Sequence, residues 1–195
     1  MTAKRRIEPS DILSLDAYTT ERPAYRARMM AHKKDRRLAV GPNATLHFES
    51  FETMLYQVQE MLHTERGGDE QLADELAAYQ PLIPQGNELV ATLMLEYENP
   101  TKRAEMLARL GGIEETLTLE FDGEIVNASW ERDVDRTTPD GKTSSIHFLH
   151  FHMTPEQAAK FAAGGAKVTV AVGHPAYPHM TVMSEATRKA LTASL

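Results

Sequence analysis

The spacing of apolar residues predicts helices in the first half of the chain. Apolar side chains within residues 54–62 recur every three or four positions, which is the period of an amphipathic helix. A further helix is expected over 69–79, after a Gly-Gly stop. Upstream, a Ser-Asp cap predicts a short helix over 10–18, and a second basic helix is expected over 21–37 with Pro23 in its first turn.

Strand patterns dominate the second half. A strand, a Gly-Pro-Asn turn and a second strand are expected over 38–48, and the other expected strands are 89–97, 116–121, 125–130, 145–152 and 167–172. Helices are expected over 99–111, 154–163 and 185–191, with polar loops at 132–142 and 174–179. Helices that cluster early and strands that cluster late predict a single α+β domain over 1–195, with a mainly antiparallel sheet and helices concentrated in the N-terminal half.

Composition narrows the class of protein. The chain has 195 residues, of which 42% are hydrophobic and 25% charged, as in an ordinary globular protein and unlike a disordered or collagen-like chain. It contains no Cys, which excludes a disulfide framework, a thiolate zinc site and an iron–sulfur cluster of its own. The basic N-terminus lacks the apolar core of a signal peptide, and no apolar stretch is long enough to span a bilayer. We therefore expect a cytoplasmic protein with no membrane partner.

Charge is distributed unevenly. Residues 1–37 carry a net charge of +5, although the whole chain carries −7. We expect a basic helical arm that packs on the acidic body, or that uses Arg26, Arg28 and Arg36 to dock an acidic partner or a second copy of the chain. Nucleic acid is the other polyanion that such an arm suits, but the acidic remainder would repel it.

Five of the eight histidines lie between positions 147 and 179. On the strand expected over 145–152, side chains alternate between faces, so His150 and His152 share one face and His147 points to the other. Two imidazoles on one strand face can bind zinc, iron, copper or nickel. The alternative is that His150 and His152 are surface or capping residues at the end of the strand.

The loop 174–179 is a second candidate site. Two prolines stiffen it between His174 and His179, and Tyr177 lies beside them. The two histidines would bind one ion together or act as acid–base groups. The alternative is a rigid turn whose histidines bond backbone carbonyls. If the strands at 145–152 and 167–173 are neighbours, this loop lies near one end of the histidine-bearing strand.

Carboxylates supply the remaining candidates. Glu60 borders the apolar stripe of the helix at 54–62, and Gln57 lies on an adjacent face. Glu60 and His63 match half of a di-iron motif, but the chain holds a single copy of it. The alternative is the polar edge of an amphipathic helix. A phosphate-binding loop around Gly141 is excluded because position 136 is Arg.

Several blocks together resemble one family. They are RRLAVGPNATLHFESFETMLYQVQEML (36–62), DELAAYQPLIPQGNELVATLMLE (74–96), GKTSSIHFLHF (141–151) and HPAYPH (174–179). The chain is similar in these blocks to bacterial proteins that share the domain of unknown function 3501. The resemblance implies a peroxide-stress or redox setting, because members are often encoded beside rubrerythrin-like proteins and iron–sulfur oxidoreductase subunits. The blocks contain Gln57, Glu60, Glu75, Tyr79, Glu88, Glu96, His147, His174 and Tyr177.

These observations give two hypotheses of different kinds. In the first, the protein binds non-haem iron or zinc and is an accessory protein or small metalloenzyme that serves a redox protein partner. The expected metal ligands are His147, His174, His179, Glu60 and Glu96, with Tyr177 and Gln57 supporting the bound group. In the second, it is a non-catalytic interaction subunit that docks an acidic partner, or forms a homodimer, through the basic arm.

Overall fold

Antiparallel strands form two sheets in the computed structural model, which describes residues 4–130, 137–138 and 141–195. One sheet has the order β1-β2-β3-β7-β6 and the other β5-β4-β8-β9. Their bounds are β1 Arg37–Val40, β2 Ala44–Phe48, β3 Glu88–Leu95, β4 Leu117–Phe121, β5 Glu124–Asn127, β6 Ser129–Trp130, β7 Ile146–His152, β8 Thr169–Val172 and β9 His179–Val182. Every pairing between these strands is antiparallel, which confirms the predicted sheet type.

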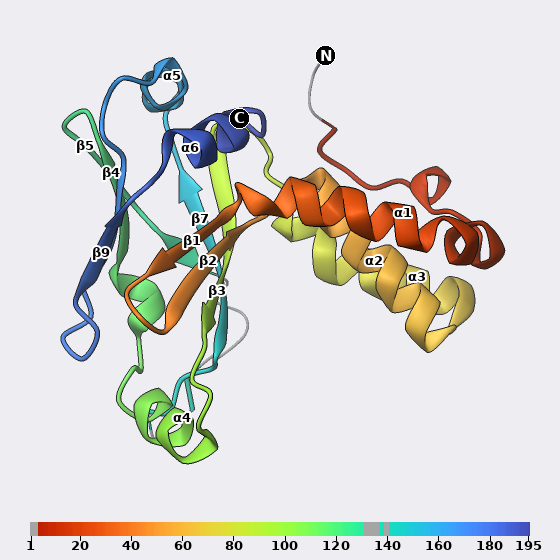
Figure 1. Ribbon diagram of the computed structural model, residues 1–195, viewed down its shortest axis with the longest axis horizontal. Helices are drawn as coiled ribbons and strands as arrows, with labels where there is room; N and C mark the ends of the chain where they lie inside the picture. Colours follow the sequence, from red (N-terminus) through yellow and green to blue (C-terminus); the bar gives the residue numbers. More distant parts are fainter. Residues whose placement is uncertain (1–3, 131–136, 139–140) are drawn as a thin grey trace.

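The two sheets pack face to face around the main hydrophobic core (Figure 1). Alternate residues of β3 and β7, such as Leu93 and Phe151, point inward and meet Leu119 and Val170 of the other sheet's strands in one buried cluster. The chain passes from one sheet to the other at Ala128, where β5 gives way to β6. The sandwich therefore leaves one face of the five-stranded sheet free for the helices.

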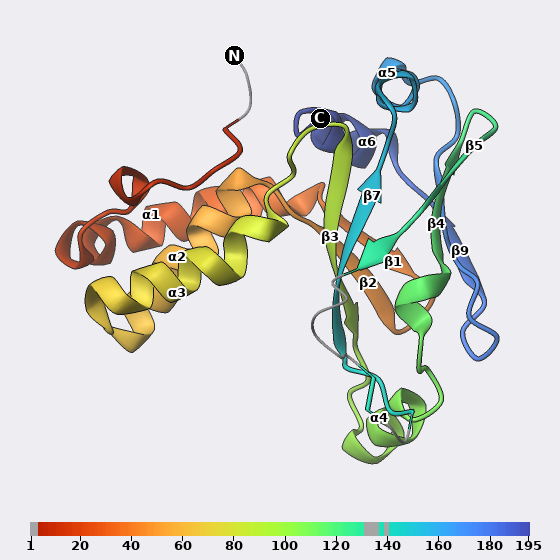
Figure 2. The same cartoon turned by 180° about the vertical axis from the view of Figure 1, so that it is seen from behind.

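Helices project from that outer face and lie at the two ends of the sandwich (Figures 1 and 2). Their bounds are η1 Pro9–Asp11, α1 Leu15–Lys34, α2 Phe51–Glu65, α3 Gly68–Tyr79, η2 Gln80–Leu82, α4 Pro100–Leu107, η3 Ile113–Thr116, α5 Pro155–Ala163 and α6 Glu185–Thr192. The first three long helices project from the outer face as one arm, whereas α4 lies at one end of the sandwich and α5 and α6 lie at the other. The concentration of helices in the N-terminal half is confirmed.

A second, smaller core joins the arm to the sheet. Met54 and Val58 of α2 are buried against Leu82 and against Val90 of β3, and Phe148 of β7 packs on the same cluster. These apolar contacts exclude water from the middle of the outer face. Glu88 of β3 and His150 and His152 of β7 lie on the same face, next to this apolar cluster.

The first long helix differs from its prediction. A break was expected near residue 19, but α1 is continuous, with Pro23 inside it. Proline removes one backbone hydrogen bond. The helix nevertheless continues because Tyr18 and Met29, eleven residues apart and so on the same face, are both buried in the arm.

Three further expectations concern the second half. The strand β9 is not among the predicted strands, because the sequence predicts only a loop over 174–179 before the helix expected at 185–191. The strands at 145–152 and 167–173 are not neighbours, since β7 and β8 belong to different sheets. Of the loop predicted at 132–142, residues 132–136 and 139–140 lie outside the described residues.

Within the described ranges, no helix combines the length and the apolar character needed to cross a bilayer.

Candidate metal site

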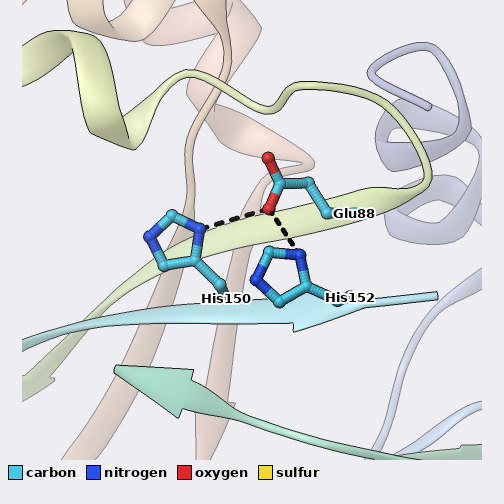
Figure 3. A group of neighbouring side chains, drawn as sticks. All are labelled: Glu88, His150 and His152. Atoms are coloured by element: carbon cyan, nitrogen blue, oxygen red, sulfur yellow. Dashed lines mark hydrogen bonds and ion pairs between the residues drawn. The ribbon is translucent and has the colours of Figure 1, made fainter. Parts of the chain in front are cut away.

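Two strands bring a carboxylate and two imidazoles together on the outer face of the five-stranded sheet. In the antiparallel register, Glu88 of β3 lies opposite His152 of β7, and Val90 lies opposite His150. Residues directly opposite each other, and residues two apart along a strand, share a face. Glu88, His150 and His152 therefore project to the same side, as Figure 3 shows. The predicted common face of His150 and His152 is confirmed.

The three side chains converge on one carboxylate oxygen. Oε2 of Glu88 lies 3.2 Å from Nδ1 of His150 and 3.1 Å from Nδ1 of His152. The two imidazole rings are nearly parallel, with an interplanar angle of 14° and centroids 5.6 Å apart. One atom from each of the three residues falls within 4.8 Å of the others, which makes this trio a group that could hold a metal ion.

The loop before β3 holds the Glu88 carboxylate in place. The backbone N–H of Gln85 donates to Oε1 of Glu88 at 2.6 Å, so the oxygen that does not face the imidazoles is also bonded. Gly86 adopts a φ of +94°, and a Cβ there would come within 2.6 Å of the Arg5 guanidinium. This position therefore needs glycine. The turn is fixed by its backbone, and it orients the carboxylate.

Electrostatics keeps this buried carboxylate ionised. Burial raises the pKa of Glu88, but the hydrogen bonds from His150 and the Gln85 amide lower it by more, and the net pKa is below the ordinary value. A carboxylate accepts and does not donate, so Nδ1 of His150 carries the proton that it donates to Glu88, whereas Nδ1 of His152 lies 3.1 Å from the same oxygen. The trio is thus a carboxylate that accepts one imidazole N–H, from His150, and lies close to the second imidazole, that of His152.

The donor set and its spacing fit a divalent transition metal. A metal bound about 2.0–2.2 Å from each donor holds neighbouring donors about 3.0–3.4 Å apart, and the two Nδ1–Oε2 distances fall in this range. Two His and one carboxylate form the ligand set of non-haem iron enzymes and of many catalytic zinc sites. The side chain of His152 is 65% exposed and that of Glu88 only 5%, so the site is anchored on one side and open to solvent on the other.

His147, which was expected to be a ligand, lies on the opposite face of β7 and is buried between the sheets. Its Nε2 lies 3.0 Å from the Ser144 carbonyl and 3.1 Å from the Thr143 hydroxyl, while Nδ1 lies 3.5 Å from a carboxylate oxygen of Glu114. The sheet therefore separates His147 from the Glu88, His150 and His152 trio.

His174 bonds the backbone with both of its ring nitrogens. Nδ1 accepts the N–H of Ala176 at 3.1 Å, so Nε2 carries the proton and donates to the carbonyl of Gly111 at 3.2 Å. No lone pair remains for a metal. His174 therefore agrees with the alternative expected for the loop, a rigid turn whose histidines bond backbone carbonyls, whereas Nδ1 of His179 is buried without a hydrogen-bond partner among the described residues.

Tyr177 and His179 fasten the same loop to the hairpin of β1 and β2. The Tyr177 hydroxyl accepts the N–H groups of Asn43 and Ala44, and it donates to the carbonyl of Val40 at 2.9 Å. The His179 ring lies against Tyr177, with centroids 4.2 Å apart. Burial raises the pKa of Tyr177. Its hydroxyl is fully used in joining two loops, which leaves it no contact with a bound group.

Gly41 makes this junction sterically possible. Its φ is +72°, and a Cβ there would come within 2.5 Å of the His179 ring and 2.8 Å of the Tyr177 hydroxyl. Glycine is therefore required both by the backbone conformation and by the space. The histidine–tyrosine loop is a packing feature of the sandwich.

The expected site residues on α2 hold helices together. Glu60 accepts two hydrogen bonds at 2.8 Å from the Arg22 guanidinium and another from the Tyr18 hydroxyl, both on α1. These bonds, the Arg22 bonds above all, lower the pKa of Glu60 to about 2. The Gln57 amide lies 3.4 Å from the Tyr79 hydroxyl of α3. Glu60 thus ties α2 to α1, and Gln57 faces α3.

Glu96, the other expected carboxylate ligand, follows β3 at the end opposite Glu88. It accepts a hydrogen bond from Thr45 at 2.6 Å and lies 3.4 Å from Arg37. Eight residues of extended strand separate Glu88 from Glu96 by about 26 Å. Among the described residues, the five expected ligands do not gather into one group, whereas the trio of Glu88, His150 and His152 does.

The signal for this trio was present in the sequence only in part. Alternation along 145–152 predicted that His150 and His152 share a face. Glu88 lies in one of the blocks that resemble the family, but the strand is expected to begin at residue 89 and nothing in the sequence pairs Glu88 with the two histidines. The pairing of β3 with β7 joins segments about sixty residues apart, and local patterns do not encode such a pairing.

Comparison with known proteins places the chain in a family. A crystal structure described as a novel protein of unknown function from Burkholderia pseudomallei matches over 100% of both chains, with 39% sequence identity and a TM-score of 0.90. No functionally curated protein matches the chain significantly. The family model described as "Protein of unknown function (DUF3501)" matches residues 6–195. The chain therefore belongs to the DUF3501 family.

Proposed function

We propose that the protein binds one divalent transition metal, iron or zinc, through Glu88, His150 and His152. The observation that carries the proposal is the convergence of two imidazole Nδ1 atoms on one oxygen of a buried, ionised carboxylate, at the spacing of neighbouring metal ligands. Two neutral imidazoles and one carboxylate leave a net positive charge on a bound divalent ion, which favours an anionic or polar further ligand.

The exposure of His152, at the open side of the trio, supports a reactive role. A structural metal site is closed by four protein ligands, whereas three protein ligands leave positions for water or substrate. His152 borders solvent, and the helical arm covers the apolar part of the same face. A metal held there would supply Lewis-acid or one-electron chemistry. We propose a small metalloenzyme or metal-dependent accessory protein, and the setting in a redox system rests on what the resemblance to the family implies.

The protein's own groups would set how a metal enters. Nδ1 of His150 carries the proton that it donates to Glu88, and that proton has to move to Nε2, or leave, before Nδ1 can bind a metal. The Gln85 amide keeps Oε1 of Glu88 bonded throughout, so Oε2 is the oxygen that remains for the metal. We expect a change of tautomer at His150 on metal binding, which nitrogen-15 NMR of the labelled imidazoles reports.

Elemental analysis tests the proposal. Untagged protein is purified without chelator, loaded anaerobically with Fe(II) or separately with Zn(II), and desalted. We expect about one metal per chain in the wild type and less than about a tenth of that in His152→Ala and Glu88→Gln, because two remaining ligands hold a divalent ion weakly. His152 is exposed, so its variant should fold normally, which circular dichroism verifies.

The matched control is His179→Ala, a histidine from the other histidine-bearing region. We expect it to retain the wild-type metal content. A wild type that holds no metal after loading with either ion would contradict the proposal. So would His152→Ala protein that keeps a full equivalent, or metal lost from His179→Ala while the trio remains intact.

A further inference from the structure

Helix α1 buries only a narrow stripe of its surface. Tyr18 and Met29 are buried in the arm, and Arg22 and Tyr25 are half-buried, but most of the other side chains between them are exposed. Met30 is 74% exposed, which is unusual for a large apolar side chain on a helix that already has a packed face. Beside it runs a groove of about 430 Å³, lined by α1 residues from Thr19 to Met30 and by His63 of α2.

The groove is cationic as well as apolar. From residue 22 to 34 the helix carries five Lys or Arg and no Asp or Glu. Arg22 is neutralised by Glu60. Arg26 lies in the groove and Lys33 lies one helical turn beyond the end of the groove. Neither of these two residues forms an ion pair with any other described residue. Arg36, which was expected to belong to this docking surface, is instead buried and donates to Ser194 and the carbonyl of Ala190.

Helix α3 of the same arm has the complementary surface. Leu72, Leu76 and Tyr79 pack toward the arm's core. The exposed stripe consists of Glu70, Ala73, Asp74 and Ala77, at the helical spacing of three and four residues.

This α3 stripe is acidic and narrow. Helix α3 contains no Lys or Arg, and Glu70 and Asp74 form no ion pair within the described part of the chain. The small Ala73 and Ala77 side chains let another helix approach closely. The α3 stripe is therefore complementary to the α1 groove in charge and in width.

Within one chain these two surfaces do not meet. Helices α1 and α3 both pack on α2, which lies between them (Figure 2). Neither surface therefore covers the other within the single chain, whereas a second copy carries both of them. Isologous association makes each contact twice, which is how most homodimers close.

We propose that two copies of the chain form a symmetric dimer in which the α3 stripe of each occupies the α1 groove of the other. Exposed ion pairs contribute modestly and are screened by salt, and Met30 is the apolar residue that the contact would cover. We expect micromolar association that weakens as ionic strength rises. The dimer uses none of the metal-site residues, so this proposal is independent of the proposed function.

Sedimentation equilibrium with reciprocal charge reversals tests the dimer. The wild type should be dimeric at about 100 µM protein in about 50 mM NaCl, and at least about 10-fold weaker in association at about 500 mM NaCl. Arg26→Glu/Lys33→Glu and Glu70→Lys/Asp74→Lys should each be monomeric in low salt, because each variant opposes like charges at both contacts.

An equimolar mixture of the two double variants should form a heterodimer, since both of its contacts again join opposite charges. The control is Lys102→Glu/Lys167→Glu, a reversal of two exposed lysines on the sandwich, which should dimerise like the wild type. Circular dichroism checks that each variant is folded. A wild type that stays monomeric at low salt, charge-reversed variants that still dimerise, or a mixture that stays monomeric would each overturn the proposal.

Discussion

Two regions of the molecule are rich in histidine, and they differ in what their nitrogens bond. In the trio on the outer face of the five-stranded sheet, two Nδ1 atoms point at one oxygen of Glu88. In the loop between β8 and β9, both nitrogens of His174 are bonded to backbone, and Tyr177 bonds three backbone groups. The comparison teaches that convergence on a common point, and not the number of histidines, distinguishes a candidate metal site from a structural junction.

The largest expected loss of stability comes from Tyr177→Phe, a variant of the structural junction. Removing the hydroxyl leaves the Asn43 and Ala44 N–H groups and the Val40 carbonyl without their partner, and groups buried without a partner destabilise the fold. We expect the free energy of unfolding to fall by about 2–3 kcal/mol, measured by urea denaturation. Metal content should be unchanged in the folded variant. Stability equal to that of the wild type, or metal lost from folded protein, would break the distinction between the two regions.

A smaller loss of stability is expected from Glu60→Gln. Its comparison with Glu88→Gln contrasts two carboxylates. Glu60 bonds Arg22 and Tyr18, so its loss should lower the free energy of unfolding by about 1–2 kcal/mol at pH 7 and leave metal content unchanged. Glu88→Gln should instead remove the metal. The pair thus separates a structural carboxylate from a ligand.

The pH dependence of the Glu60 effect follows from its pKa. The folded-state pKa is lowered from 4.5 to about 2, so the ionised carboxylate stabilises the fold above about pH 4.5, and this contribution disappears as the pH falls through about 2. Urea denaturation of the wild type and Glu60→Gln at pH 7, 4 and 3 measures it. The gap in stability between the two should narrow across this series, and a gap that stays constant would contradict the assigned pairing with Arg22.

Local signals in the sequence predicted much of the fold. The Gly41-Pro42-Asn43 turn predicted the β1–β2 hairpin, and Asp122-Gly123 predicted the turn of the β4–β5 hairpin, where both residues have positive φ. The Thr154-Pro155-Glu156-Gln157 cap predicted the start of α5. Each of these features depends on residues close together in the chain, where turn and capping chemistry acts.

Features that depend on distant residues were not predicted. The division into two sheets, the pairing of β3 with β7 and the short edge strand β9 are set by packing between segments far apart in sequence. Helix α1 runs through Pro23 because contacts with α2 outweigh one lost backbone bond. For the candidate site, the shared face of His150 and His152 was local information, whereas the position of Glu88 opposite them was not.

Anomalous diffraction from a crystal of the metal-loaded protein tests the central claim most directly. Data collected on either side of the absorption edge of the loaded metal locate it and identify it. The account predicts one strong peak about 2.0–2.3 Å from Oε2 of Glu88 and from Nδ1 of both His150 and His152. A peak at His174 and His179 instead, or crystals of loaded protein in which both imidazoles stay in direct contact with Glu88 and no peak lies between them, would contradict it.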